Sequence, residues 1–275
     1  MMAEQTPERS PARGRMRPLP IFIALAVLLI TGLWLALTPE GLLGKTDAVG
    51  YAVCHRIDVR SFHLGERPLP LCARCTGMYL AALSAFAFFT ITAGRAGLYP
   101  RRAVIAVLVA GAALWAFDGL NSFATLIPGA PHLYEPNNTL RLITGSMIGV
   151  GLMTMIYPAF QQIAWVDWEA ARVIPGRRQF TALLLVVGFV DLLVLTEQPL
   201  VLYPLAILSG VGVLVLLTLA YSLIALQILK RESAARTGFD LALPVFLGFG
   251  LALLQVGGID LLRYLATGTW GGFHL

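Results

Sequence analysis

Charged residues are scarce in this chain of 275 residues, where they make up 13% of the sequence against about 25% in soluble domains. Hydrophobic residues make up 57%. Because so few charges cannot cover a water-exposed surface of this size, the composition excludes a soluble fold, and its apolar content excludes intrinsic disorder. Cysteine is also scarce, with three residues, which excludes a small disulfide-stabilised scaffold.

The hydrophobic residues gather in blocks long enough to cross a bilayer, which takes about 20 residues. Long apolar runs with few or no charges predict seven transmembrane helices, within 18–39, 76–94, 103–120, 142–157, 179–195, 198–229 and 241–264. We therefore expect an all-α, polytopic membrane helix bundle that forms a single transmembrane domain over residues 18–275. The pattern Gly145-x-x-x-Gly149 predicts close packing between two of these helices.

Residues 1–17 contain four arginines, two prolines and few apolar residues, which predicts a disordered basic tail. The Lys and Arg residues also predict the orientation, because cytoplasmic loops carry an excess of positive charge. With the N-terminus in the cytoplasm, 13 of them fall on the inner side and seven on the outer side. We expect a multi-pass protein of the bacterial cytoplasmic (inner) membrane, with its N-terminus inside and its C-terminus outside. The net charge of +5 then serves topology, and nucleic acid is not an expected partner.

The segment 40–75 departs from this charge rule, since it holds five of the seven outer cations. It also holds all three cysteines and two of the four histidines, and we expect it to form a Cys/His loop. Two cysteines in a Cys-x-x-Cys pair can hold one tetrahedral ion, and an upstream Cys-His pair completes a set typical of zinc. The predicted metal ligands are Cys54, His55, Cys72 and Cys75, and zinc is the expected cofactor.

Adjacent ligands such as Cys54 and His55 are awkward on one ion, so His63 or His132 is an alternative source of the nitrogen ligand. A c-type haem site is excluded, because it needs His directly after the second cysteine and Thr76 stands there.

Redox chemistry of the cysteine pair is the main alternative to metal binding. Cys72 and Cys75 precede a predicted helix, whose N-terminus lowers thiol pKa values together with the charge of Arg74. A membrane thiol–disulfide oxidoreductase could use this pair and pass electrons to a lipid-soluble carrier such as quinone. A structural disulfide is the third interpretation, against which the odd number of cysteines argues.

Three aspartates, Asp118, Asp191 and Asp260, lie within predicted membrane helices, where ionisable residues are costly and usually serve a site. Helical rise places all three in the outer half of the membrane, which predicts a polar, outward-facing cavity capped by the Cys/His loop. Asp118 and Arg141, which opens the next helix, are the candidate catalytic residues.

Arginine matches phosphate geometry bidentately, so a lipid or anion transporter or transferase is a further alternative. Its partner would be an anionic lipid or a small-molecule ligand, held by Arg56, Arg60, Arg74 and Arg141. The lipid bilayer itself is the remaining expected partner.

The pattern C-H-R…R-S-F…P-L-C-A-R-C-T-G over Cys54–Gly77 resembles an uncharacterised family of bacterial multi-pass membrane proteins, a domain of unknown function. The matching residues are Arg56, Arg60, Ser61, Phe62, Cys72, Arg74, Cys75, Thr76 and Gly77. The resemblance continues through Asp118-Gly119 and Asn138–Gly145. It implies membrane residence and a shared site but brings no activity with it, so catalysis, transport and a structural role all stay open.

Overall fold

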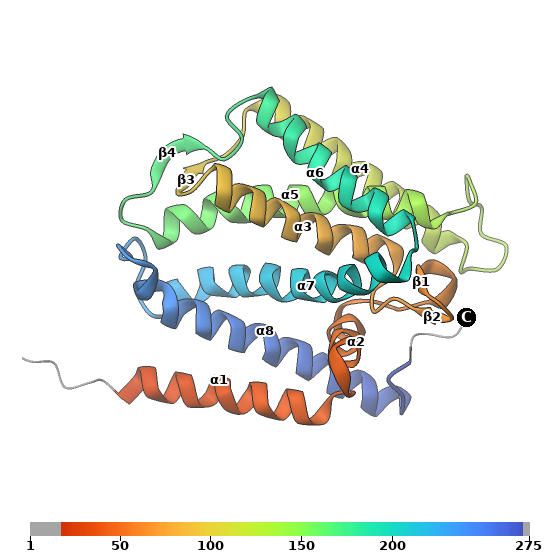
Figure 1. The fold of residues 1–275 in the computed structure, drawn as a ribbon, viewed down its shortest axis with the longest axis horizontal. Coiled ribbons are helices and arrows are strands. Elements are labelled where there is room, and N and C mark those ends of the chain that lie inside the picture. The colour runs from red at the N-terminus through yellow and green to blue at the C-terminus, as the bar shows by residue number, and fades with distance from the viewer. Residues whose placement is uncertain (1–17, 272–275) are drawn as a thin grey trace, which may run out of the picture.

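The computed structural model describes residues 18–271, and in them eight α-helices form an elongated bundle (Figure 1). Seven of these helices are long and apolar enough to cross a membrane: α1 (Pro18–Leu37), α3 (Ala73–Thr92), α4 (Arg102–Ala124), α5 (Asn138–Ala164), α6 (Arg177–Leu195), α7 (Pro199–Ile228) and α8 (Gly238–Thr267). The predicted all-α membrane bundle with seven spans is confirmed. The tail expected over residues 1–17 lies outside the described residues.

The segment 40–75 is more ordered than the loop that the sequence predicts. It contains α2 (Gly41–Val53), the short 3-10 helix η1 (Asp58–Arg60) and the antiparallel hairpin of β1 (His63–Leu64) and β2 (Arg67–Pro68). A hydropathy pattern that identifies membrane spans does not detect α2, because its 13 residues are too few to span a bilayer. The other strands, β3 (Ala96–Leu98) and β4 (Glu169–Arg172), pair in parallel at the opposite end of the bundle (Figure 1).

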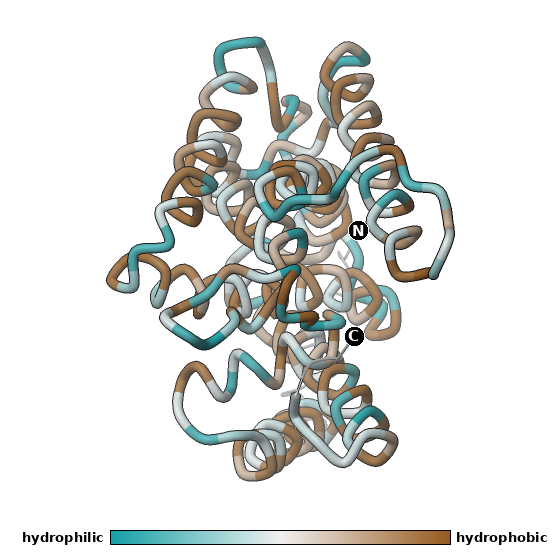
Figure 2. The backbone as a smooth tube through the Cα atoms, turned by 90° about the vertical axis from the view of Figure 1, so that its right-hand side faces the viewer, coloured by the Kyte–Doolittle hydropathy of each residue, from teal (hydrophilic) through white to brown (hydrophobic). Residues whose placement is uncertain are grey.

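The helices pack in layers around a central pair, α3 and α5. On one side α7 packs against α3, α8 packs against α7, and α1 packs against α8; on the other side lie α4 and α6. Helix α1 buries one residue, Val27, so most of its surface is left to face lipid. Figure 2 looks along the bundle from the end that carries α2, where hydrophilic residues gather in the segments that connect the hydrophobic helices.

Helices α3 and α5 approach each other closely because glycines lie between them. A Cβ atom at Gly145 would collide with the carbonyl oxygen of Arg74, and one at Gly149 would collide with that of Met78. Small residues allow such backbone contact between membrane helices, so the packing predicted from Gly145-x-x-x-Gly149 is confirmed. The contact fixes the first turn of α3, which carries Arg74, against α5.

We predict that Gly145→Ala lowers the free energy of unfolding by about 1–3 kcal/mol, because the added methyl group overpacks a backbone contact. Thermal unfolding in detergent measures the effect. Gly151→Ala is the matched control on the same helix, because nothing lies within 4 Å of a Cβ there. Equal melting temperatures for the two variants would contradict this account of the α3–α5 contact.

Candidate metal centre

Two helix ends bring the first two cysteines together. Cys54 is the residue that ends α2, and Cys72 is the residue that precedes the first turn of α3. Gly50 permits this approach, since a Cβ atom there would collide with the carbonyl oxygen of Pro70. Both cysteines are buried, so the fold holds them in a defined place rather than in a mobile loop.

The potential ligand atoms of Cys54, His55 and Cys72 all lie within 4.8 Å of one another. The thiol of Cys75, on the first turn of α3, interacts with the thiols of both Cys54 and Cys72. In a tetrahedral site with zinc–sulfur bonds of about 2.3 Å, the sulfur atoms lie about 3.8 Å apart. The spacing of these side chains therefore suits a single zinc ion.

The two other candidate histidines lie apart from this cluster. The Nε2 atom of His63 is 3.2 Å from Asp58, and the Nε2 atom of His132 is 2.8 Å from Glu135. Both contacts are exposed, so neither histidine supplies the nitrogen of the Cys/His cluster in this structure.

Backbone hydrogen bonds reach the sulfur atom of Cys54, and side-chain hydrogen bonds favour negative charge on Cys72. The backbone N–H groups of Arg56 and Cys72 donate to Sγ of Cys54 at 3.4 and 3.3 Å. Arg56 adopts a left-handed conformation, with φ of 52°, which is uncommon for a residue other than glycine. Hydrogen bonds from the thiols of Cys54 and Cys75, with a further one from His55, lower the pKa of the Cys72 thiol.

The ring of His55 is oriented as a hydrogen-bond donor toward the sulfur atoms. Its Nδ1 atom accepts a hydrogen bond from the backbone N–H of Ile57 at 3.0 Å. A neutral imidazole whose Nδ1 accepts carries its proton on Nε2, whereas a histidine that binds a metal usually donates through its other nitrogen. In this conformation His55 therefore supports the Cys72 thiolate, and binding of a metal through Nε2 would require the hydrogen bond from Ile57 to break.

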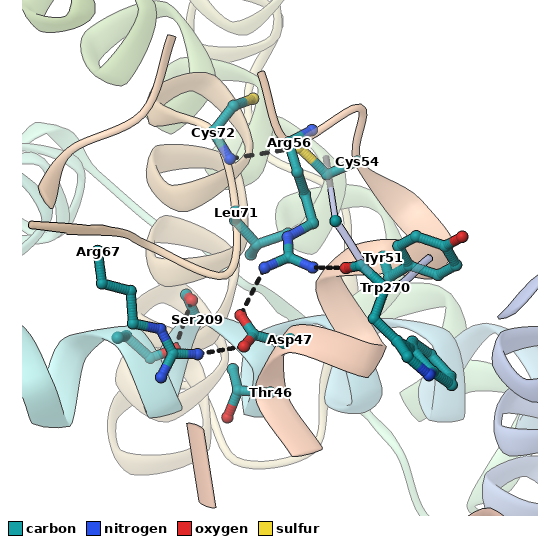
Figure 3. Close-up of polar contacts among 12 residues, drawn as sticks. Thr46, Asp47, Tyr51, Cys54, Arg56, Arg67, Leu71, Cys72, Ser209 and Trp270 are labelled. Atoms are coloured by element: carbon teal, nitrogen blue, oxygen red, sulfur yellow. Dashed lines mark hydrogen bonds and ion pairs between the residues drawn. The ribbon is translucent and has the colours of Figure 1, made fainter. Parts of the chain in front are cut away.

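An acidic residue that sequence analysis overlooked holds the loop together (Figure 3). Asp47 on α2 pairs through Oδ1 with Nη2 of Arg56 at 2.8 Å and through Oδ2 with Arg67. Arg56 also donates to the backbone oxygen of Trp270 at 2.9 Å. Burial raises the pKa of Asp47, and the charges of the two arginines oppose that shift. The segment 40–75 holds four acidic residues, Glu40, Asp47, Asp58 and Glu66, and no pattern in the sequence distinguishes Asp47 from the other three.

A second arginine closes the loop from the far end of the chain. Arg263 on α8 donates through Nη1 to the backbone oxygens of Tyr51 and Cys54 at 2.5 and 2.7 Å. Its guanidinium carbon lies 4.0 Å from the centre of the Tyr51 ring. A cation at the carboxyl end of a helix satisfies the last carbonyl groups, so Arg263 positions the end of α2 and with it Cys54.

Asp118, one of the two candidate catalytic residues, lies in a polar cluster beside the cysteines. It forms an ion pair with Arg74, and its Oδ1 atom accepts a hydrogen bond from the hydroxyl group of Tyr134 at 2.7 Å. Burial and this hydrogen bond raise the pKa of Tyr134 to about 12. Sequence analysis did not identify Tyr134, because it lies in the connection between α4 and α5, outside the predicted membrane helices and outside the cysteine motif.

The other candidate catalytic residue, Arg141, is buried on the first turn of α5. Its Nη1 atom donates to Oδ1 of Asn138 at 3.0 Å. The charges of Arg60, Arg74 and Asp118 all act on it, so Arg141 belongs to the same polar cluster as Asp118.

The three membrane aspartates are all buried, but the structure gives each a different partner. Asp191 accepts a hydrogen bond from Ser146 at 2.7 Å, and Asp260 accepts one from the indole N–H of Trp34 at 3.3 Å. Asp260 lines an apolar cavity of about 480 Å³ between α1 and α8. These two helices lie on one side of the central pair α3 and α5, whereas α4, which carries Asp118, lies on the other side (Figure 1). The prediction that the three aspartates share one site rested on their equal depth in the membrane. Depth does not indicate which helices are neighbours, and in the structure the three side chains bind different partners.

Fold and site together define a multi-pass membrane protein that carries a buried Cys/His cluster at one end of its bundle. The chain belongs to the family described as "Predicted membrane protein (DUF2085)", whose model matches residues 54–155. A relative described as "Uncharacterized protein" from Methanothermobacter thermautotrophicus is 31% identical over 103 residues, which are 38% of this chain and 83% of the relative. No solved structure matches the chain. The matched residues include the three cysteines, Asp118 and Arg141, whereas Asp47, Asp191 and Asp260 lie outside them.

We predict that Asp47→Ala lowers the free energy of unfolding by about 1–3 kcal/mol, because it leaves the donors of the largely buried Arg56 without their carboxylate. In a chain of this size that corresponds to a fall in melting temperature of roughly 2–12 °C. Asp58→Ala is the control in the same segment, since the Asp58 side chain is 68% exposed and exposed ion pairs contribute little. If Asp47→Ala left the melting temperature unchanged, as Asp58→Ala should, Asp47 would not stabilise the loop through its ion pairs.

Proposed function

We propose that this protein is a membrane protein with a zinc site at one end of its helix bundle, in which Cys54, Cys72 and Cys75 bind the ion as thiolates. The observation that carries the proposal is that the thiols of Cys54 and Cys72 lie within 4.8 Å of each other, and that the Cys75 thiol interacts with both. Zinc is favoured because soft thiolate ligands in a tetrahedral arrangement select it over magnesium or calcium.

Burial favours metal binding over thiol–disulfide exchange. Cys72, which the redox alternative pairs with Cys75, is 3% exposed, Cys54 is 7% exposed and Cys75 is half-buried, whereas exchange requires that a partner thiolate reach one of the sulfur atoms. The N–H groups that point at Cys54 are also what a permanently charged thiolate requires, since hydrogen bonds to an ionised acceptor are the strong ones.

His55 would then act on the site through its hydrogen bond, and three protein ligands would leave one position of a bound zinc ion for a water molecule or a substrate. Zinc with three protein ligands is the arrangement of catalytic sites, where the ion acidifies a bound water or polarises a bound group. A closed Cys₃His site, with His55 as the fourth ligand, would instead be structural. The acceptor role of Nδ1 in His55 favours the open site.

We further propose that the protein lies in the cytoplasmic membrane of a bacterium as a single transmembrane domain, with the Cys/His end facing outward. The opposite end of the bundle supports this orientation, because the three connections that lie there, α3–α4, α5–α6 and α7–α8 (Figure 1), collect nine positive charges: Arg95, Arg101, Arg102, Arg172, Arg177, Arg178, Lys230, Arg231 and Arg236. Such an excess is typical of the cytoplasmic side.

We predict about one zinc ion per chain in the purified wild-type protein and its loss in Cys72→Ser, because a hydroxyl group replaces a central thiolate ligand. Elemental analysis measures the metal, and a thiol reagent should react with wild-type cysteines only after chelation. His63→Ala, a change in the same segment outside the cluster, should keep its zinc. Wild-type protein with no metal and one free thiol would support the redox alternative, and stoichiometric zinc in Cys72→Ser would exclude this ligand set.

The orientation is tested by cysteines placed at the two ends of the bundle. Glu66 in the β1–β2 turn and Glu232 between α7 and α8 are both exposed, so Glu66→Cys and Glu232→Cys form a matched pair. In intact cells a membrane-impermeant maleimide should label Glu66→Cys, while Glu232→Cys should react only after permeabilisation. The reverse pattern would place the Cys/His cluster in the cytoplasm.

A further inference from the structure

Four elements bring three arginines and a single carboxylate into one cluster beside the cysteines. Arg60 lies in η1, Arg74 on α3, Arg141 on α5 and Asp118 on α4. Arg60 is 8% exposed, Arg141 is 6% exposed and Asp118 is 1% exposed. The set carries a net charge of +2, because it contains three guanidinium groups and one carboxylate. Buried charge without a partner of opposite sign is costly, so this set calls for a further anion.

Neutral acceptors leave this charge uncompensated. Arg60 donates through Nη2 to the backbone oxygen of Ser122 at 2.9 Å and to the Thr125 hydroxyl group at 3.2 Å. The Nε atoms of Arg74 and Arg141 are buried and have no hydrogen-bond partner among the described residues. Donors therefore remain in the cluster, in addition to charge.

Asp118 is already committed within the cluster. It pairs with Arg74 and accepts from the hydroxyl groups of Tyr134 at 2.7 Å and Thr144 at 3.4 Å. These contacts make Asp118 a positioning residue that fixes Arg74 against α4, and they leave the charges of Arg60 and Arg141 without a carboxylate in this cluster.

The thiolates of the zinc site offset part of the positive charge but not all of it. Cys72 interacts electrostatically with both Arg60 and Arg141, so the two sites are neighbours. Three thiolates and one Zn²⁺ ion have a combined charge of −1, which against +2 leaves one positive charge. An anion that enters the arginine cluster would therefore lie beside the zinc site and complete the balance of charge.

We propose that Arg60, Arg74 and Arg141 bind the phosphate group of the molecule on which the zinc site acts. The reaction of that molecule rests on the proposed zinc function, whereas its binding by the three arginines does not. Arginine suits phosphate because its planar donors pair with two oxygens at once, and all three arginines lie within residues 54–155, which the family model matches. The phosphate group belongs either to a lipid headgroup or to a soluble ester.

The experiment measures the rise in melting temperature that a ligand of the native state produces. Purified protein is titrated with inorganic phosphate against chloride at equal ionic strength, and separately reconstituted with phosphatidic acid against diacylglycerol. Each variant is compared with its own ligand-free melting temperature, so a lower baseline stability does not enter the result. A shift with phosphate identifies a soluble source, and a shift with phosphatidic acid alone identifies a lipid.

Arg141→Gln should weaken the apparent affinity on the order of tenfold to hundredfold, because it removes a charged donor. Arg141→Lys should recover part of that loss, since it keeps the charge but not the paired donors. Arg67→Gln is the control, because Arg67 lies in the same loop but pairs with Asp47. No shift with either ligand, or an equal shift in Arg141→Gln and wild type, would overturn the proposal.

The same titration on Cys72→Ser separates this inference from the zinc proposal. Binding of phosphate to a folded, zinc-free variant would support the anion site independently of the metal. If Arg141→Gln lost zinc and the wild type showed no shift with either ligand, the arginines would serve only to balance the thiolates, and the proposed anion site would be excluded.

Discussion

Positive charge buried at the end of a membrane bundle is the constraint on which this structure depends. Two unit charges 4 Å apart interact by about 4 kcal/mol in the environment of a protein surface and by more in its interior, so each buried arginine needs a partner held in place. Asp47 supplies that partner for Arg56, and Asp118 supplies it for Arg74. The loop, the start of α3 and the connection after α4 are arranged around these pairs.

The bundle provides the rigidity that such pairs require. Backbone contact at Gly145 fixes the turn of α3 that carries Arg74, and the adjacent residues Cys72 and Cys75 are fixed with it. Arg263 fixes the other side of the cluster by binding the end of α2. The Cys/His cluster therefore joins segments from both ends of the chain, although its own residues lie within 54–75.

Hydropathy was sufficient to predict the seven spans, because a helix that crosses a bilayer must be apolar over its whole length. It began the helix of α5 too late, since the first turn contains Arg141, which is buried in protein rather than exposed to lipid. Cysteine spacing predicted the cluster around Cys54 and Cys72 for a similar reason, because ligands of one ion must be close. Asp47 and Tyr134 escaped prediction because their roles depend on which segments are neighbours in space, which no local pattern encodes.

X-ray absorption at the zinc edge of the purified protein tests the central claim most directly, because it counts the atoms bound to the metal. The account predicts sulfur neighbours at about 2.3 Å, three for each zinc ion, with one lighter atom in the remaining position. A first shell of only nitrogen and oxygen atoms, at about 2.0–2.2 Å, would show that any bound zinc lies away from the cysteines and would contradict the proposed site.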